Sequence, residues 1–414
     1  MPVLRIKGGT PLRGEIYASG AKNAVLPMTA ASVLINGRVT LTNCPRIADA
    51  ETSAEIIKAL GGCAEFDKNM LTIDCSGLNL TRIPQRLCEK MRSSITFCGP
   101  LLARFGCVGF YEPGGCVLGK RPIDLHIKGF KAMGAEVIEE RGKITLKGSL
   151  KGVKINLPFP SVGATQSLMA AACLAKGTTV ITNPSKEPET LALADFLNLC
   201  GGKISFYENK VEIEGVNRLH SAQARVIPDR IEAATYLCAA AATKGEITIK
   251  GITISELGII GDVLKKTGCI LTEEHNAVFL KAPQRLNAVD GLTTAPYPGF
   301  PTDLQPQICA LLSLAQGKSV VTETVFEARN RHIPELIKTG AEITEKNRSF
   351  IINGVNSLKG AKLTAFDLRG GAALVIAALA AEGTSEIHNP HHIFRGYEGL
   401  IQKITSLGGN IEIL

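Results

Sequence analysis

The chain has 414 residues, of which 45% are hydrophobic and 20% charged, so we expect two or three well-packed domains rather than a disordered protein. Its net charge of +8 includes no dense block of lysine and arginine, which argues against a nucleic-acid partner and suits a cleft for small anions. No apolar run approaches the roughly 18 residues of a membrane span, and the start MPVLRIKGG does not resemble a signal peptide. We therefore expect a cytoplasmic protein without a membrane partner.

Six apolar, helix-like runs recur along the chain at intervals of 66 to 72 residues, and each ends in a glycine. These glycines are Gly37, Gly106, Gly177, Gly245, Gly317 and Gly383. A more amphipathic run ends 23 to 28 residues later in a second glycine, at Gly61, Gly134, Gly201, Gly268, Gly340 and Gly408. Helices that are apolar on all sides are buried, those with one polar face lie outside, and glycine is typical of helix C-caps. The spacing predicts six repeats of one α/β design, with short alternating strands between the helices.

Six repeats predict two α/β domains of three repeats each. The segment VLRIK (3–7) should pair with the last strand, NIEIL (410–414), which otherwise lacks a partner. We therefore place the first domain at 22–228, and the second at 229–414 together with 1–21.

The buried helices should begin with polar residues. Counting back 14 or 15 residues from the first glycines leads to Lys22, Arg92, Gly163, Arg230, Asp303 and Arg369. Helix N-termini attract anions, so these ends predict a cleft for phosphates and carboxylates. Capping alone would explain Asp303 or Ser161, but it explains the cations poorly, because positive charge is unfavourable at a helix N-terminus.

The longest gap between paired glycines, from Gly106 to Gly134, contains the loop PGGCVLGKRP with Cys116. Two neighbouring cations, Lys120 and Arg121, would favour the thiolate, so Cys116 is a candidate nucleophile or general acid. The alternative is a spare cysteine among the twelve of the chain.

Other polar residues have two interpretations. Asp303, in GFPTDLQPQ, is either a helix cap or a base directed into the cleft. Several arginines could bind phosphate or carboxylate bidentately, or could simply be solvated: Arg92, Arg121, Arg329, Arg369 and Arg395. The sequence has no Walker loop, no GxGxxG, no GxSxG and no histidine and cysteine at metal-binding spacing, so we expect neither a cofactor nor a metal.

The motifs resemble those of the enolpyruvyl transferases over essentially the whole chain. They are SGAKNA (19–24), MRSSI (91–95), PGGCVLGKRPIDLHI (113–127), SVGAT (161–165), PDRIE (228–232), FPTD (300–303), TETVFEAR (322–329), DLR (367–369) and RGYE (395–398). The resemblance implies two inside-out, barrel-like α/β domains with a cleft between them. It also implies transfer of the enolpyruvyl group of phosphoenolpyruvate to the 3′-hydroxyl of UDP-N-acetylglucosamine in peptidoglycan synthesis, with release of phosphate.

The resemblance implies a role for individual residues. Asp303 would take the proton of the sugar hydroxyl and Cys116, the thiol that fosfomycin alkylates in the family, would protonate phosphoenolpyruvate. The phosphoenolpyruvate site would comprise Lys22, Asn23, Arg121, Arg369 and Arg395, with Asp367 in support. The nucleotide-sugar site would comprise Asn23, Arg92, Arg121, Pro122, Ile123, Asp124, Leu125, Ser161, Val162, Gly163, Asp303 and Val325. Lys22 and Arg395 would also serve catalysis as fixed cations.

The chain departs from the family pattern before SVGAT, where Phe159 and Pro160 stand in place of a lysine that relatives often carry. Lys120 would compensate in part for that lost diphosphate contact. Two alternatives stay open: a sister transferase that acts on shikimate 3-phosphate but lacks the PGGC loop, and a catalytically silent UDP-sugar-binding paralogue. We expect a monomer with at most weak self-association.

Overall fold

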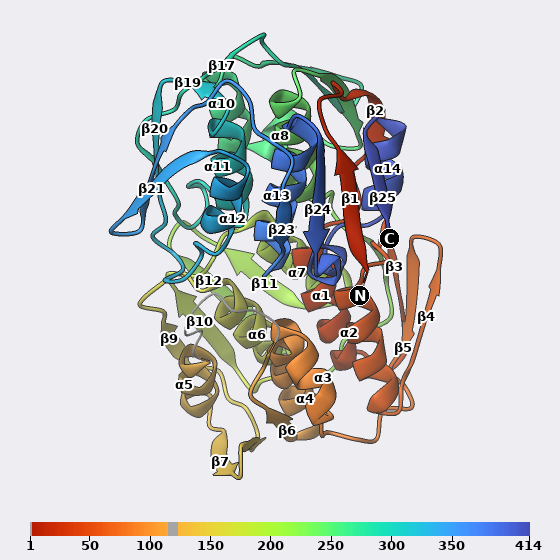
Figure 1. The fold of residues 1–414 in the computed structure, drawn as a ribbon. Helices are drawn as coiled ribbons and strands as arrows, with labels where there is room; N and C mark the ends of the chain where they lie inside the picture. The colour runs from red at the N-terminus through yellow and green to blue at the C-terminus, as the bar shows by residue number, and fades with distance from the viewer. Residues whose placement is uncertain (1, 115–122) are drawn as a thin grey trace. The chain divides into compact units, whose positions relative to one another are not determined.

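The computed structural model describes residues 2–114 and 123–414. These residues divide into two compact units: unit 1 comprises 2–19 and 228–414, and unit 2 comprises 20–114 and 123–227. Each unit has its own hydrophobic core. Figure 1 traces the elements of both along the chain.

In unit 2, three sheets enclose three apolar helices. The first sheet has the strand order β13 (Gln223–Arg225), β3 (Arg38–Thr42), β5 (Met70–Asp74), β4 (Cys63–Asp67). The second has the order β6 (Cys107–Tyr111), β8 (Lys143–Lys147), β7 (Glu136–Glu140). The third has the order β11 (Lys203–Phe206), β12 (Lys210–Glu214), β10 (Thr178–Thr182), β9 (Lys154–Asn156). The enclosed helices are α1 (Lys22–Ala31) with η1 (Ser32–Leu34), α4 (Cys98–Phe105) preceded by η2 (Arg92–Phe97), and α6 (Val162–Ala172). Helices with an exposed face are α2 (Ala48–Ala59), α3 (Gln85–Lys90), α5 (Asp124–Ala132) and α7 (Pro188–Leu199).

Unit 1 repeats this design. Its sheets run in the orders β23 (Lys362–Thr364), β24 (Thr384–His388), β1 (Val3–Lys7), β25 (Asn410–Ile413); β15 (Ile270–Glu274), β16 (Ala277–Lys281), β14 (Glu246–Lys250), β2 (Arg13–Tyr17); and β18 (Leu292–Thr293), β20 (Lys318–Thr322), β22 (Ser349–Asn353), β21 (Glu342–Lys346), with a short pair β17 (Leu286–Asn287) and β19 (Ala315–Gln316). The enclosed helices are α8 (Arg230–Ala242), α11 (Gln305–Leu312) preceded by η3 (Thr302–Leu304), and α13 (Leu368–Ala380). Outer helices are α9 (Ile254–Leu257), α10 (Ile259–Lys266), α12 (His332–Lys338), η4 (Pro390–Arg395) and α14 (Leu400–Ser406).

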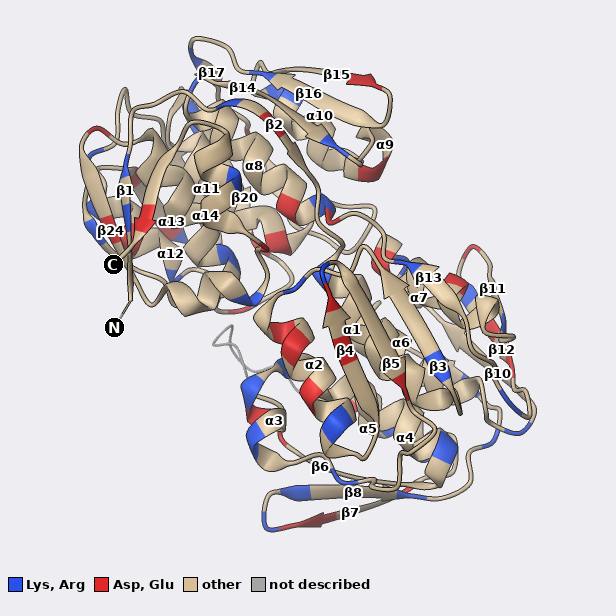
Figure 2. Cartoon of the chain, turned by 90° about the vertical axis from the view of Figure 1, so that its right-hand side faces the viewer, with Lys and Arg blue, Asp and Glu red and all other residues tan. Residues whose placement is uncertain are grey.

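The enclosed and the outer helices differ in burial as predicted. All thirteen residues of α8 and all eight of α11 are buried, whereas α2 and α10 each have an exposed face. Figure 2 shows the enclosed helices free of charge over most of their length, while α2 and α3 carry residues of both signs. The predicted α/β class with three repeats per unit is confirmed.

The repeated glycines serve two different purposes. All six second glycines have positive φ, between 83° and 101°, and follow the outer helices as predicted for C-caps. The first glycines were expected to end the apolar helices as well, and this is wrong for most of them. Only Gly106 directly follows its helix, with φ 67°, and the other five lie three to six residues beyond the helix end.

The first glycines instead form a backbone hydrogen bond with the strand region of their own repeat. The carbonyl of each accepts a backbone hydrogen bond of 2.9–3.1 Å from a residue that follows the last strand of the repeat. The six donors are Cys75, Gly148, Gly215, Ala282, Gly354 and, for the last repeat, Gly8. The first glycines are therefore regularly spaced because the same backbone hydrogen bond recurs in every repeat.

The N-terminal strand completes the last repeat. Strand β1 is antiparallel to β25, with Leu4 opposite Ile413, and antiparallel to β24 on its other side. The predicted pairing of residues 3–7 with the last strand is confirmed.

Substituting Gly354 with alanine should strongly destabilise unit 1, because the added Cβ would lie 1.5 Å from the carbonyl oxygen of Ala315. Overpacking of this kind costs about 1–3 kcal/mol or more. The matched control is Gly261→Ala in α10, where the nearest atoms lie 3.8 Å or more from the new Cβ. Thermal unfolding should show a lower Tm for the first variant alone; equal Tm values would contradict the packing described.

Candidate active site

The enclosed helices begin at the polar residues that the repeat predicts. Lys22, Arg92 and Arg230 are the first residues of α1, η2 and α8, and Gly163 and Arg369 are the second residues of α6 and α13. Asp303 lies in η3, directly before α11. Because the rest of each helix is packed in an apolar core, its first turn is where a polar side chain can serve a ligand.

Asp303 in unit 1 is held by two buried arginines. Its Oδ1 accepts a hydrogen bond of 2.9 Å from Arg329, and its Oδ2 accepts from Nε and Nη2 of Arg369 at 3.3 and 3.1 Å. The arginine side chains are 4% and 3% exposed, whereas Asp303 is 26% exposed. Neither η3 nor α11 has a side-chain cap, so the interpretation of Asp303 as a helix cap is wrong. Its carboxylate is fixed and remains within reach of solvent.

Tyr397 joins the three enclosed helices of unit 1 behind this ion pair. Its hydroxyl is 3.3 Å from Nη1 of Arg369, 3.1 Å from the Gln307 amide and 2.9 Å from the Thr235 hydroxyl. Burial disfavours the charged guanidinium, but the Asp303 carboxylate outweighs it and the pKa of Arg369 is raised. Arg369 thus stays charged in a buried position.

Capping carboxylates explain how cations can stand at two helix starts. Asp229 accepts from the backbone amides of Ile231 and Glu232 at the start of α8. Asp367 does the same for Arg369 and Gly370 at the start of α13. Each aspartate offsets the positive end of its helix, next to an arginine of the same motif.

A buried glutamate of unit 1 binds Ser19, the first residue of the motif SGAKNA. Glu232 accepts hydrogen bonds from the Ser19 amide and from the Lys403 ammonium group, both at 2.8 Å. Burial raises the pKa of Glu232 even though Lys403 is adjacent. Sequence reasoning missed this cluster, because Lys403 lies 171 residues from Glu232.

Two further predicted residues lie in loops of unit 1. Arg395 is the last residue of η4 and is half-buried. Val325 follows β20, and its backbone amide donates to the Glu323 carboxylate at 2.7 Å.

In unit 2, Lys22 pairs with a carboxylate that the sequence did not reveal. Its Nζ is 3.2 Å from Oδ2 of Asp49 in α2, and the two side chains are 14% and 5% exposed. Asn23 lies next to it, half-buried in the first turn of α1. Arg92 is half-buried and donates to the Pro113 carbonyl at 3.4 Å.

The predicted nucleotide-sugar residues of unit 2 lie at the starts of two helices. Ser161 is the N-cap of α6 and accepts from the Ala164 amide at 3.4 Å, while Val162 and Gly163 form the first turn. Ile123 precedes α5, which begins with Asp124 and Leu125, and Asp124 forms an exposed ion pair with Lys128. Ser161 therefore does cap its helix, and the exposed Phe159 lies two residues before it.

His126 was not selected from the sequence, yet it lies against the start of α6. Its Nε2 would be 3.1 Å from a Cβ at Gly163. Burial, with a contribution from the Arg92 charge, lowers the pKa of His126 to about 4. A neutral imidazole thus borders the helix end where an anion is expected.

Four predicted residues fall outside the described residues: Cys116, Lys120, Arg121 and Pro122. Of the eleven cysteines that are described, nine are buried. Burial raises the pKa of Cys75, Cys173 and Cys200 to about 12, so these thiols are poor acids and poor nucleophiles at neutral pH. In the described ranges, no group of three or more histidine, cysteine or acidic side chains is arranged to bind a metal. Nor is any described helix long and apolar enough to cross a bilayer.

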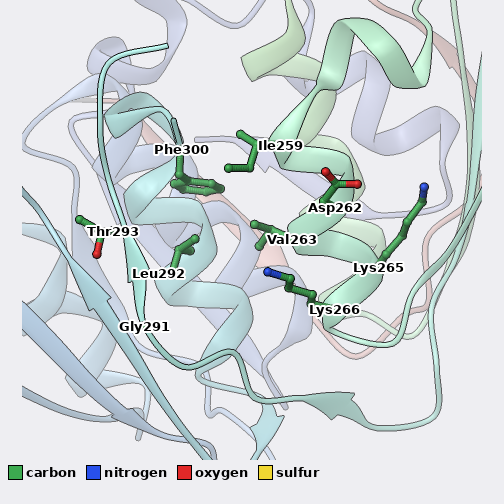
Figure 3. Close-up of a pocket in the computed structure, with 9 residues that line it drawn as sticks. All are labelled: Ile259, Asp262, Val263, Lys265, Lys266, Gly291, Leu292, Thr293 and Phe300. Carbon is green, nitrogen blue, oxygen red and sulfur yellow. The ribbon is translucent and has the colours of Figure 1, made fainter. Parts of the chain in front are cut away.

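A pocket of about 680 Å³ lies elsewhere in unit 1, between α10 and residues 291–293. Figure 3 shows Phe300 and Leu292 on one side, facing Ile259 and Val263 of α10. None of the predicted site residues that are described lines it. This pocket therefore lies apart from the described residues of the predicted site.

The fold is that of the enolpyruvyl transferases. The family of EPSP synthase (3-phosphoshikimate 1-carboxyvinyltransferase) matches residues 6–404, and the chain belongs to it. Within the family, it is 45% identical over 413 residues to UDP-N-acetylglucosamine 1-carboxyvinyltransferase 2 of Caldanaerobacter subterraneus subsp. tengcongensis, with 99% of each chain covered. It is 44% identical to UDP-N-acetylglucosamine 1-carboxyvinyltransferase of Trichlorobacter lovleyi, over 100% of this chain and 99% of that protein.

Solved structures agree on the fold. The enolpyruvyl transferase NikO from Streptomyces tendae superposes with a TM-score of 0.91 at 26% identity, over 100% of this chain and 99% of that one. EPSP synthase from Acinetobacter baumannii gives a TM-score of 0.78 at 20% identity over both full chains. The second similarity concerns the fold alone.

Stability should decrease as the pH falls from about 6.5 to about 4, and His126 should contribute to that decrease. In this window the unfolded imidazole binds a proton that the folded protein excludes, so acid favours unfolding. When the pH is lowered from 7 to 5, the free energy of unfolding should decrease in both proteins. The decrease should be about 2 kcal/mol smaller in His126→Gln than in the unsubstituted protein. Denaturant unfolding at both pH values measures this, with the exposed His275→Gln as control. An unchanged pH dependence in His126→Gln would contradict the buried neutral state.

Proposed function

We propose that this protein transfers the enolpyruvyl group of phosphoenolpyruvate to the 3′-hydroxyl of UDP-N-acetylglucosamine, the first committed step of peptidoglycan synthesis. One observation carries the proposal: over nearly the full chain, the sequence is 43–46% identical to proteins named as this transferase. The charged helix starts suit two substrates that both carry phosphate. We also propose that the protein acts in the cytoplasm as a monomer.

The reaction is an addition followed by an elimination. The sugar 3′-oxygen forms a bond to C2 of phosphoenolpyruvate and loses its proton, while C3 gains a proton and becomes a methyl group. The tetrahedral intermediate then loses one methyl proton and expels phosphate, which restores the double bond. Two groups that exchange protons and several fixed cations are sufficient for this sequence.

Asp303 is proposed as the group that takes the hydroxyl proton. Arg329 and Arg369 favour its ionised form and fix both oxygens, so the carboxylate is oriented before the substrate arrives. Cys116 is proposed as the donor to C3.

The remaining predicted residues are proposed to bind the substrates, and both units contribute. Lys22, Asn23, Arg121, Arg369 and Arg395 would bind phosphoenolpyruvate. Asn23, Arg92, Arg121, Pro122, Ile123, Asp124, Leu125, Ser161, Val162, Gly163, Asp303 and Val325 would bind the nucleotide sugar. Because Lys22 and Arg369 already pair with carboxylates, each is oriented without substrate, and less conformational entropy is lost on binding.

The choice of acceptor can be tested by phosphate release. The purified protein is incubated with phosphoenolpyruvate and either UDP-N-acetylglucosamine or shikimate 3-phosphate. Release with the nucleotide sugar alone is expected. Release with shikimate 3-phosphate alone would identify the sister transferase, and release with neither would favour a silent binding paralogue.

Asp303→Asn should lower kcat about 10²–10⁴-fold, because a neutral amide cannot accept the hydroxyl proton. Phosphate release in the presence of both substrates measures kcat. The matched control is Asp290→Asn, an exposed aspartate of the same unit. If Asp303→Asn kept more than a tenth of the activity, the proton-accepting role would be wrong.

A further inference from the structure

Glu323 lies between two parts of the proposed acceptor site in unit 1. It follows β20 directly and is 2% exposed. On one side is the turn that carries Asp303, and on the other is the loop that carries Val325. No role has been assigned to Glu323 so far, although it belongs to the motif TETVFEAR.

Both oxygens of this carboxylate are occupied by donors. Oε1 accepts from the Thr294 hydroxyl at 3.0 Å and from the backbone amides of Val325 and Phe326 at 2.7 and 3.0 Å. Oε2 accepts from the Thr302 hydroxyl at 2.8 Å. One buried side chain thus connects Thr294, which directly follows β18, with the Val325 loop and the start of η3.

The contact with Thr302 continues to Asp303. The Thr302 hydroxyl gives its proton to Glu323, so its lone pair is free to accept from Nη1 of Arg329 at 3.2 Å. The same nitrogen of Arg329 donates to Asp303 at 2.9 Å. Glu323 therefore influences, through one hydroxyl, the arginine that orients the proposed base.

The Val325 loop reaches the same arginine by a second route. The Phe326 ring lies 4.7 Å from the Arg329 guanidinium carbon, in a cation–π contact. Glu323 therefore accepts hydrogen bonds from two residues that contact Arg329: from the hydroxyl of Thr302 and from the backbone amide of Phe326.

We propose that Glu323 is a positioning residue that holds the Asp303 turn and the Val325 loop in register for the acceptor sugar. This role rests on the proposed function, since it concerns the residues that would contact the sugar. Glu323 touches neither substrate in this scheme and acts through Thr302 and the loop amides.

The role requires a carboxylate of this length. Four donors converge on the side chain, and glutamine would present only one acceptor oxygen to them. Aspartate can still accept from amides two and three residues ahead, as in an Asx turn, but it is one methylene too short to reach Thr302 as well. Substitution can therefore separate two sets of Glu323 contacts. We call the hydrogen bond from the Thr302 hydroxyl the Thr302 arm, and the hydrogen bonds from the Val325 and Phe326 amides the loop arm.

The Thr302 arm is tested by Thr302→Val and Glu323→Asp. Each should lower kcat about tenfold, the usual effect of losing one hydrogen bond to a charged group, with the KM for UDP-N-acetylglucosamine changed less than about twofold. The double variant should be no slower than either single variant, because both changes break one contact. Thr302→Ser, which keeps the hydroxyl, should recover most of the loss.

The loop arm is tested by Glu323→Gln. It should also raise the KM for UDP-N-acetylglucosamine, by about fivefold or more, because the Val325 and Phe326 amides lose part of their acceptor. Hydrogen exchange should become faster at these two amides in Glu323→Gln and stay unchanged in Thr302→Val. Glu342→Gln, an exposed glutamate of the same unit, is the matched control and should match the unsubstituted protein throughout.

Three outcomes would overturn the positioning role: additive losses in the double variant, kinetics within twofold of the unsubstituted protein in both single variants, or unchanged exchange in Glu323→Gln. Variants are compared only where Tm shows a folded protein. If the unsubstituted protein releases no phosphate, the proposed function fails, and amide exchange still decides whether Glu323 holds the loop.

Discussion

The enclosed helices impose the constraint on which the site depends. They are apolar along their length and packed in the cores, so only their first turns can present polar groups. Several of these first turns carry cations, which the helix dipole disfavours. Carboxylates offset this unfavourable positive charge. Asp49 pairs with Lys22 and Asp303 pairs with Arg369. Asp229 and Asp367 cap α8 and α13. In each unit these pairs of opposite charges are therefore formed before any substrate binds.

Features with a local or periodic signal could be predicted from the sequence. The six repeats follow from apolar runs at regular spacing, and the same spacing located the helix starts from Lys22 to Arg369. The pairing of β1 with β25 followed from a strand that lacked a partner. The Ser161 cap was available as an alternative, because serine before a helix is a common cap.

Side-chain contacts between distant segments could not be predicted. Asp303 meets Arg329 and Arg369, which are 26 and 66 residues away, and nothing in GFPTDLQPQ distinguishes a paired carboxylate from a cap. His126 gave no signal, because its burial depends on how α5 packs beside α6. Glu323 gave no signal either, because its partners Thr294 and Thr302 lie 29 and 21 residues away in the sequence. The first glycines were misinterpreted because a helix end and a strand contact favour the same residue.

The position of β1 has a consequence for synthesis of the chain. Unit 1 is built from both ends of the sequence, and β1 must wait for β24 and β25 before its sheet exists. The described residues of unit 2 all lie between 20 and 227, so they leave the ribosome while most of unit 1 is still untranslated. The order of folding during translation is then set by topology: unit 2 can fold first, while the first strand of unit 1 remains an unpaired edge until the last residues emerge.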